Sequence, residues 1–543
     1  MSPAGAFSFV LHSHLPYARQ AGRWPHGEEW IHEALTDTYI PLLDALLDLR
    51  EEGVAFKLTI GLTPVLLEQL ADELIKENFE EFVDEKIRRA EADCARFEGT
   101  SDPRGRLAAF WLEFHQRVRS CFVDRLKRDV PGAFAALGRS GHLDILTSAA
   151  THGYLPLLST DSSIRGQLRT GRRASARHLG AEPRSIWLPE CAYRPAYQAN
   201  GTLRPGIETF LEAEGIRAFF AETHLVEGGR PTGKAAGDAI GPYGEVRRRY
   251  AVPQEEASQK QGTTFQPYYV GKSNVAVFAR NNRTGLQVWS GEHGYPGDYW
   301  YREFHKKDGV SGLHYWRVSG AGVDLGDKEY YDPAHASQRT AEHAAHFAAL
   351  VRGLLTEYKA ESGAPGAIIA AYDTELLGHW WFEGVEWLAR VLRHLSADPE
   401  VELTSASDYV EEHPPREFID LPEGSWGQAG THFTWLNGDT EWMWPIIHQA
   451  EKTMEELASR GGEEAVLNQA ARELLLLQSS DWPFLVTTGQ AADYAVQRFV
   501  SHVERFRELE AILHSRQSGR ERAAELYELD KVFPDIDYRD FAP

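Results

Sequence analysis

Cysteine is scarce in this 543-residue sequence: Cys94, Cys121 and Cys191 are well separated, and no two of them form a CxxC pair. Three isolated thiols argue against a disulfide framework and against a thiolate zinc site. A reducing compartment is the simplest setting for such a chain. The sequence therefore predicts a cytoplasmic protein.

Long apolar runs and a surplus of basic residues are also missing. No run approaches the ~18 apolar residues of a membrane span, and the first residues, MSPAGAFSFV, lack the features of an export signal. With 57 Lys and Arg against 80 Asp and Glu, the formal charge of −23 repels nucleic acid and anionic membranes. We expect neither as a partner.

Apolar and aromatic residues, by contrast, are plentiful. Hydrophobic residues make up 42% and aromatic residues 11% of the chain, including 15 Trp. A chain of this length and composition buries a large core and divides into two or three structural units. Tryptophan serves both as a core residue and as a sugar-stacking residue, and composition does not separate these uses.

Strand and helix patterns alternate along most of the chain. Helical periodicity follows the first strand over residues 28–50 and recurs over 205–214, 335–358 and 383–394. This order is typical of a parallel sheet, and we expect it to close as a barrel. The predicted strands are 6–14, 56–64, 142–152, 185–193, 216–225, 275–281, 367–375 and 401–407.

Three other segments depart from this alternation. A charged helical pattern over about 77–130 is too long for a simple crossover and predicts a helical insertion. The glycine-rich stretch 227–266 has little periodicity, which is typical of a functional loop or a disordered one. From about 441 the pattern is helical to the end. We expect a catalytic domain over 1–415, with an active-site loop at about 227–250, and a helical domain over 416–543.

The stretch FVLHSHLPY carries two histidines, His12 and His14, separated by one serine. In a strand these side chains point to the same face and converge at its carboxyl end. Together with an aspartate or a third histidine they are compatible with a zinc or manganese site that supports deacetylation or hydrolysis. The pattern predicts a site without settling whether it holds a metal.

Two carboxylates stand at the ends of other predicted strands, where active sites assemble in parallel β/α folds. Glu190 lies in WLPECAY, and Asp373 follows the apolar run AIIAAY. A desolvated carboxyl group can act as a proton donor, and two such groups suffice for glycoside chemistry. The alternatives are an ion-paired structural glutamate at 190 and a helix-capping aspartate at 373.

Five segments together carry a family resemblance. HSHLPY, ATHGYLP, WLPECAY, AAYDTELLGHWWFEG and HFTWLNGDTEWMWP, in this order, resemble the conserved regions of glycoside hydrolase family 57, most closely those of its α-1,4-glucan branching enzymes. The resemblance spans essentially the whole chain. It implies a (β/α)7 barrel with a helical insertion and a helical C-terminal domain, and retaining chemistry on starch-like glucans without a metal or other cofactor.

The resemblance also assigns roles. Glu190 matches the family's nucleophile, and Asp373 matches its general acid/base. His12, His14 and His152 match positions that line the donor glucose site, so that hydrogen bonding to sugar is favoured over metal binding.

Several aromatic residues match glucan-contacting positions in the same way. Trp289, Trp426 and Trp435 resemble tryptophans of the branching enzymes, and Tyr243 resembles the tyrosine that these enzymes place over the catalytic centre. The alternative for each tryptophan is a place in the core. On this alignment, the segment after Tyr243 contains an insertion relative to the family pattern.

The implied activity is that of a 1,4-α-glucan branching enzyme, with amylose-like and glycogen-like donor and acceptor chains as partners. The alternative within the family is a 4-α-glucanotransferase or α-amylase, which uses the same carboxylates. A catalytically inert glucan-binding protein and a metal-dependent carbohydrate deacetylase are rivals of other classes. We expect a monomer or a small homo-oligomer.

Overall fold

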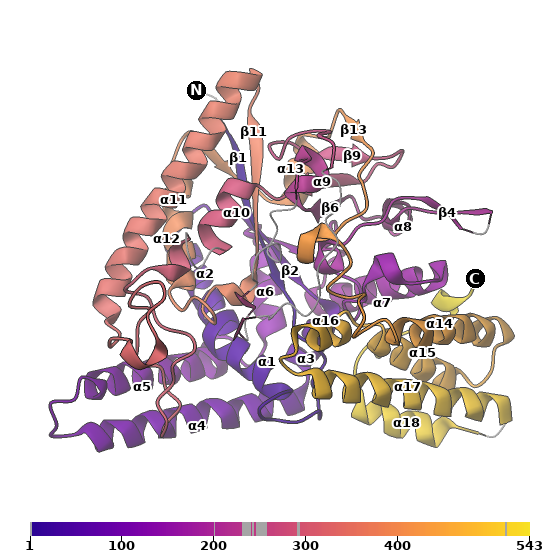
Figure 1. Ribbon diagram of the computed structural model, residues 1–543, viewed down its shortest axis with the longest axis horizontal. Helices are drawn as coiled ribbons and strands as arrows, with labels where there is room; N and C mark the ends of the chain where they lie inside the picture. Colours follow the sequence, from indigo (N-terminus) through magenta and orange to yellow (C-terminus); the bar gives the residue numbers. More distant parts are fainter. Residues whose placement is uncertain are drawn as a thin grey trace.

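The computed structural model of the chain contains a parallel sheet in which every residue of the central strand β1 is buried (Figure 1). The structure describes residues 3–199, 201–230, 240–241, 244–245, 258–289, 294–515 and 518–543. In this sheet β1 lies between β11 on one side and β12 and β2 on the other, and β3 follows β2. Its strands are β1 (Gly5–Ser13), β2 (Leu58–Leu62), β3 (Leu143–Leu146), β11 (Gly366–Asp373) and β12 (Val401–Leu403).

A second sheet has the order β13-β9-β10-β6, with β9 antiparallel to β10 and the other pairs parallel. The bounds are β6 (Ala218–Ala221), β9 (Tyr268–Val270), β10 (Ala276–Ala279) and β13 (Phe418–Ile419). Two short antiparallel pairs complete the described strands: β4 (Tyr197–Ala199) with β5 (Thr202–Arg204), and β7 (Ile240–Gly241) with β8 (Gly244–Glu245).

The predicted strand at 185–193 is wrong as a regular strand. Isolated bridges take its place. Thr147 pairs with Ile186 and Ser185 with Ala218 in parallel orientation, and Tyr193 pairs with Gly424 in antiparallel orientation. Pro189 has no N–H to donate, and Glu190 has a φ of 62°, outside the extended region, so the backbone leaves the sheet. The α/β character with a largely parallel sheet is confirmed. The (β/α)7 barrel is not confirmed, since the sheets are not closed.

Several helices pack against the first sheet (Figure 1). The predicted helix 28–50 is confirmed as α1 (Glu28–Ala34) and α2 (Ile40–Glu51), with a π-helical turn η1 (Leu35–Tyr39) between them. The longest helix, α11, is capped at its start by the Asp332 carboxylate. The other helices here are α7 (Asp161–Leu179), α8 (Ile207–Ala213), α9 (Thr223–Glu227), α10 (Asn282–Trp289), α11 (Pro333–Ser362), α12 (Gly384–Ser396) and α13 (Ala406–Glu412).

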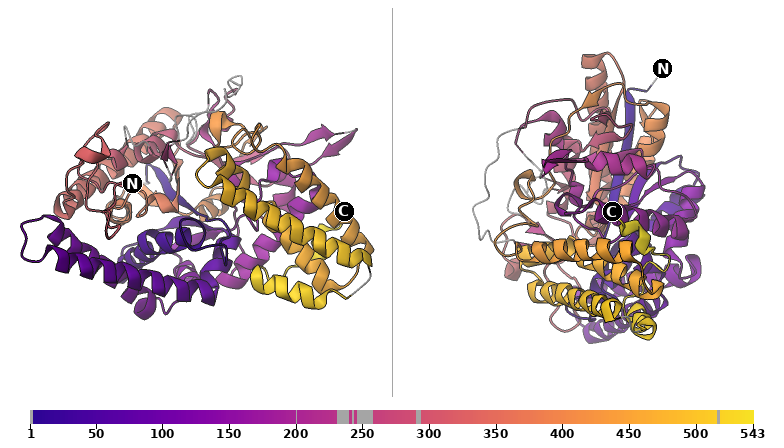
Figure 2. Two further views of the ribbon diagram at one scale, coloured as in Figure 1. Left: turned by 60° about the horizontal axis from the view of Figure 1, so that its bottom comes forward. Right: turned by 90° about the vertical axis from the view of Figure 1, so that its right-hand side faces the viewer.

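The predicted helical insertion between β2 and β3 is present, and it begins a few residues earlier than the sequence pattern indicates. The Asp72 carboxylate accepts a hydrogen bond from the Ile75 N–H and so caps the start of α4, the long helix of this insertion. Figure 2 shows α4 running beside α5 along one side of the molecule. The elements are α3 (Pro64–Ala71), α4 (Glu73–Phe97), α5 (Arg104–Ser120), η2 (Cys121–Arg125) and α6 (Val130–Arg139).

From Met443 onward the C-terminal region is helical, as predicted, and forms a block beside α7 (Figure 2). The predicted all-helical domain 416–543 is wrong in its first part, because this part contains β13, which pairs with β9 of the second sheet. Asp540 pairs with Arg173 of α7, and the backbone N–H of Ser480 donates to the carbonyl of His152, so this block is tied to the carboxyl end of the first sheet. Within the described ranges, no helix has the length and apolar composition needed to cross a bilayer. The helices are α14 (Met443–Arg460), α15 (Glu464–Leu477), α16 (Asp481–Thr488), α17 (Ala492–Ser515) and α18 (Arg520–Leu529).

Candidate active site

Polar side chains gather at the carboxyl edge of the first sheet. β1 and β11 run parallel with His12 opposite Asp373, so these two residues leave neighbouring strands at the same level. Thr63 directly follows β2 and bonds the Nδ1 atom of His14 through its hydroxyl, at 3.1 Å. The parallel register therefore brings chemistry-bearing residues from three strands together, as the sequence pattern predicts.

The three histidines form one cluster. The Nε2 atoms of His12 and His152 are 3.1 Å apart, and the ring of His14 stacks on that of His152 with centroids 3.8 Å apart. The Trp187 ring stacks against His12 at 4.9 Å. Burial, followed by the charges of His14 and His12, holds the pKa of His152 well below its usual 6.5, so this ring is neutral. A neutral imidazole can both donate and accept, which suits hydroxyl groups.

Glu190 sits on a tight turn that presents its carboxylate to this cluster. The indole N–H of Trp426 donates to Oε2 at 2.6 Å, the Ser480 hydroxyl donates to Oε1 at 3.3 Å, and Nδ1 of His152 lies 3.8 Å from Oε1. Its left-handed φ of 62° is a strained conformation of the kind that clusters at functional sites. These hydrogen bonds fix the orientation of the carboxylate, as a nucleophilic role requires.

Burial raises the pKa of Glu190 to about 7, and the charge of Asp373 adds to the rise, while the Trp426 hydrogen bond and the charge of His14 oppose it. Asp373 is therefore close enough to Glu190 for its charge to raise the pKa of Glu190.

Glu375 is a third carboxyl group at this edge, two residues after the end of β11. Its Oε1 accepts from the Tyr39 hydroxyl and from the backbone N–H of His14, at 3.3 Å in the second case. Burial raises its pKa to about 8, and the charge of Asp373 contributes. Glu375 is buried whereas Asp373 is partly exposed, so Asp373 is the more accessible of the two to a substrate.

The helical block adds two residues that the sequence pattern did not reveal. Ser480 and Asp481, at the start of α16, bond Nδ1 of His152 at 2.9 Å and Nε2 of His14 at 2.9 Å. Tyr39 and Thr63 were also missed. No local motif marks these four residues, because each becomes part of the site only through a contact far along the chain.

The ion pair between His14 and Asp481 gives a pH prediction. Burial lowers the pKa of His14, but the charge and hydrogen bond of Asp481, together with the charges of Glu190 and Glu375, outweigh burial and leave the pKa raised above 6.5. A raised histidine pKa contributes stability that is complete below about pH 6.5 and is lost as the pH rises through the folded-state pKa. Asp481→Asn is expected to lower the His14 pKa and to lower the melting temperature more under mildly acidic than under alkaline conditions.

The measurement is thermal unfolding across pH together with an NMR titration of the His14 ring. Asp493→Asn on the exposed face of α17 is the matched control. A His14 titration that is the same in the Asp481 variant and in the parent would contradict the assignment.

The predicted glucan-contacting aromatics have different environments. Trp426 bonds Glu190 and thus belongs to the site. Trp289, at the end of α10, is partly buried and lies edge-on to Tyr372. Trp435 is only 1% exposed and stacks on Tyr154 with ring centroids 4.4 Å apart. Tyr243 lies outside the described residues. The roles assigned to these four residues stay predictions.

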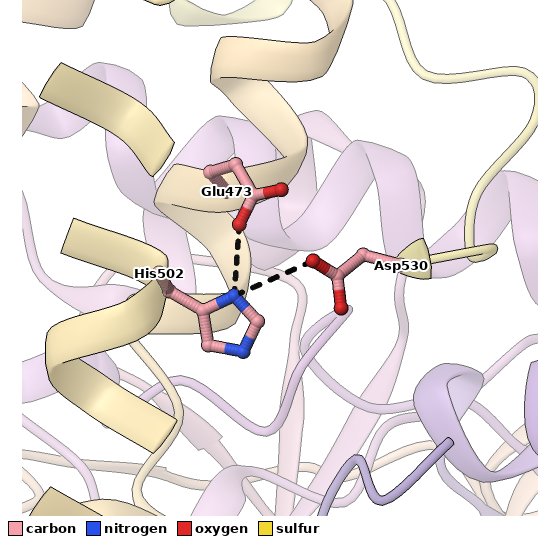
Figure 3. A group of neighbouring side chains, drawn as sticks. All are labelled: Glu473, His502 and Asp530. Carbon is pink, nitrogen blue, oxygen red and sulfur yellow. Dashed lines mark hydrogen bonds and ion pairs between the residues drawn. The ribbon is translucent and has the colours of Figure 1, made fainter. Parts of the chain in front are cut away.

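One group in the described part of the chain brings three metal-type ligand atoms together, and it includes none of the three clustered histidines (Figure 3). His502 Nδ1 is 2.8 Å from Glu473 Oε2 and 3.9 Å from Asp530 Oδ2. Arg505 pairs with Asp530, and an Arg498 nitrogen is 3.3 Å from Nε2 of His502. Two guanidinium groups oppose a further cation, so we interpret this cluster as a buried ion-pair network that joins α15, α17 and the end of α18.

Residues 8–422 match the family described as Glycosyl hydrolase family 57. The chain belongs to glycosyl hydrolase family 57. Residues 446–541, which include Ser480 and Asp481, match a domain described as "1,4-alpha-glucan branching enzyme, C-terminal". The family 57 assignment, expected from the sequence motifs, is thus confirmed, and so is the likeness to branching enzymes.

Individual relatives of this family 57 chain extend the match over its whole length. The chain is 46% identical to a 1,4-alpha-glucan branching enzyme of Thermococcus kodakarensis over 516 residues, which cover 93% of this chain and 73% of that protein. The crystal structure of the branching enzyme from this archaeon superposes with a TM-score of 0.90 at 44% identity, covering 99% of this chain and 97% of that one.

An α-amylase structure from Thermotoga maritima is also similar, with a TM-score of 0.82, 28% identity and 99% coverage of both chains. Since family 57 proteins with different names share this architecture, the fold alone does not separate branching from hydrolysis.

Proposed function

We propose that this protein is a 1,4-α-glucan branching enzyme. The observation that carries the proposal is that its C-terminal block, which matches the branching-enzyme C-terminal domain, contributes Ser480 and Asp481 to the site that contains Glu190. Full-length relatives named as branching enzymes support the same activity. The matched C-terminal domain therefore includes a residue that contacts Glu190.

In the first half of the reaction the Glu190 carboxylate attacks the anomeric carbon of an α-1,4 linkage. Trp426 and Ser480 hold this carboxylate through hydrogen bonds to different oxygens, so its orientation is set before substrate arrives. Asp373 gives its proton to the departing glycosidic oxygen. The result is a β-linked glucosyl-enzyme and a shortened chain.

In the second half Asp373 accepts the proton of the incoming hydroxyl, which attacks the same carbon from the opposite face, so the α configuration is retained. If the 6-hydroxyl of another glucan attacks, an α-1,6 branch forms. If water attacks, the outcome is hydrolysis. His12, His14 and His152 are positioned to bind hydroxyl groups of the donor sugar, because they form one face next to Glu190.

We place this activity in carbohydrate metabolism, on glycogen-like or starch-like glucans in the cytoplasm. The scarcity of cysteine and the negative formal charge of the chain support this setting. A monomer or a small homo-oligomer is consistent with it.

The test is proton NMR of linear amylose after incubation with the purified protein, with a reducing-end assay on the same samples. We expect new α-1,6 anomeric signals with few new reducing ends, because transfer conserves the number of reducing ends and hydrolysis does not. Redistributed α-1,4 chains without α-1,6 signal would identify a 4-α-glucanotransferase, and a rise in reducing ends alone would identify an amylase.

A further inference from the structure

The turn that carries His152 is braced by a glutamine of α7. The backbone N–H of Thr151 donates to Oε1 of Gln167 at 3.1 Å, and the N–H of Ala150 donates to the Gln167 carbonyl at 3.0 Å. A Cβ atom on Gly153 would lie 2.6 Å from Nε2 of Gln167, so the turn passes directly over this amide. Because His152 has a φ of 56°, its strained backbone depends on such contacts.

The helical block bonds to the same amide. Nε2 of Gln167 donates to Oε1 of Gln478 at 3.0 Å, and Nε2 of Gln478 donates to Oε1 of Glu451 at 3.2 Å. Oε2 of Glu451 accepts from the backbone N–H groups of Ser159 and Thr160, at 2.8 and 3.2 Å, and from the Ser159 hydroxyl. We call Gln167, Gln478 and Glu451 the polar row. Each of the three is at most 1% exposed, and together they tie α7 to α14 and to the end of α15.

The two ends of the polar row set the direction of its hydrogen bonds. Backbone N–H groups stand at both ends, that of Thr151 at one and those of Ser159 and Thr160 at the other, and they can only donate. A carboxamide accepts on its oxygen and donates on its nitrogen, so it passes the direction on. One member must therefore accept on both sides, and this member is Glu451. Burial raises the pKa of Glu451 to about 7, whereas the hydrogen bonds that it accepts favour the ionised form.

The polar row also holds the turn that reaches the nucleophile, because Gln478 lies two residues before Ser480. The Ser480 N–H donates to the carbonyl of His152 at 3.1 Å. The Ser480 hydroxyl contacts both Nδ1 of His152 and Oε1 of Glu190. A misplacement of about 1 Å near a reacting group can lower a rate by about 100-fold, so a small shift of these two turns would affect the reaction.

We propose that the polar row positions two turns for the reaction, the turn of His152 and the turn of Ser480. Its members act on the reaction through these two residues, so they are positioning residues and not catalytic ones. This rests on the proposed function, because it takes Glu190 to be the nucleophile. The hydrogen-bond pattern requires one carboxylate and two amides in the row, but it does not require the carboxylate to be at position 451.

The test moves the carboxylate along the row in full-length protein. Glu451→Gln leaves three amides between two donor ends, so two donors must face each other, and we expect the kcat for amylose branching to fall by about tenfold. Adding Gln478→Glu restores one carboxylate, which accepts from the amides on both sides, and should return the kcat to within about twofold of the parent. Assays at about pH 8 keep the carboxylate ionised. Gln469→Met is the matched control, since Gln469 is equally buried but bonds Glu473 and Arg472. It should leave the kcat unchanged.

A Ser480→Ala background separates positioning from a loss of stability, which thermal unfolding measures in every variant. There Glu451→Gln should lower the kcat by only about threefold, because one contact through which it acts is already gone. A parent-like kcat in Glu451→Gln, or an equal loss in both backgrounds, would overturn the proposal.

The double variant decides the matter if Glu451→Gln does not fold. A folded double variant with the parent kcat supports the proposal, and one that is unfolded or tenfold slower overturns it. Failure of the proposed function looks different, because the parent itself would then form no α-1,6 linkages. Cleavage of an aryl α-maltoside would still rank the variants in that case.

Discussion

Glu190→Gln is expected to lower turnover of amylose by about 10⁴-fold or more, because an amide cannot form the glucosyl-enzyme. The same change should leave the melting temperature unchanged or raise it. Burial lifts the pKa of Glu190 to about 7, so the ionised carboxylate costs stability near neutral pH, and a neutral amide of the same shape removes that cost. Activity assays and thermal unfolding on the same preparation separate the two effects.

The matched control is Glu182→Gln, an exposed glutamate that pairs with Arg172 on the surface. It should change neither quantity. A smaller variant, Glu190→Gly, leaves room for azide, which would attack the α-linkage directly and give a β-glucosyl azide. Turnover by Glu190→Gln within about tenfold of the parent would remove Glu190 from the nucleophile role.

The parts of the fold that could be predicted from the sequence are those set by local periodicity. The buried run of β1 and β11, the helices after them and the helical C-terminal region carry strong patterns, and they were predicted correctly. The π-helical turn at η1 could not be predicted, because one extra residue per turn leaves the apolar spacing nearly unchanged. Yet this turn carries both Tyr39, whose hydroxyl donates to Glu375, and Asp37, which bonds the ring of His379.

At 185–193, by contrast, the local pattern predicts a strand that the structure does not contain. WLPECAY combines apolar and aromatic residues that favour a strand, but Pro189 and the left-handed backbone of Glu190 and Cys191 break it. The hydrogen bonds of Trp426 and Ser480 hold Glu190 in that conformation. Local pattern thus fails at the residue with the strongest functional assignment, as expected where strain is retained for function.

The sequence predicts residues of the site only where they lie at the end of a strand. His12, His14 and Asp373 follow from the parallel register, since residues that leave neighbouring strands at one edge lie together. Asp481 comes from a helix more than 400 residues along the chain from His14, and no pattern links the two. Contacts of this kind depend on how the helical block docks, which is a property of tertiary packing.

Asp373→Ala is expected to lower turnover of amylose by about 10²–10⁴-fold, because the glycosidic oxygen then leaves without a proton. An aryl α-maltoside, whose leaving group needs no proton, should recover much of the lost rate in the first step. The maltosyl-enzyme would then accumulate, and added azide should release it as an α-maltosyl azide. Mass spectrometry of the intermediate and NMR of the azide product measure both outcomes.

The comparison that decides the role is Glu375→Gln. Glu375 also has a raised pKa, about 8. Its carboxylate, however, accepts hydrogen bonds from Tyr39 and from the His14 backbone, and these bonds hold it against the protein rather than toward a substrate. We expect Glu375→Gln to retain dependence on the leaving group like that of the parent and to give no azide product. If Glu375→Gln were rescued and Asp373→Ala were not, the proton donor would be Glu375, and the retaining pair would be Glu190 with Glu375.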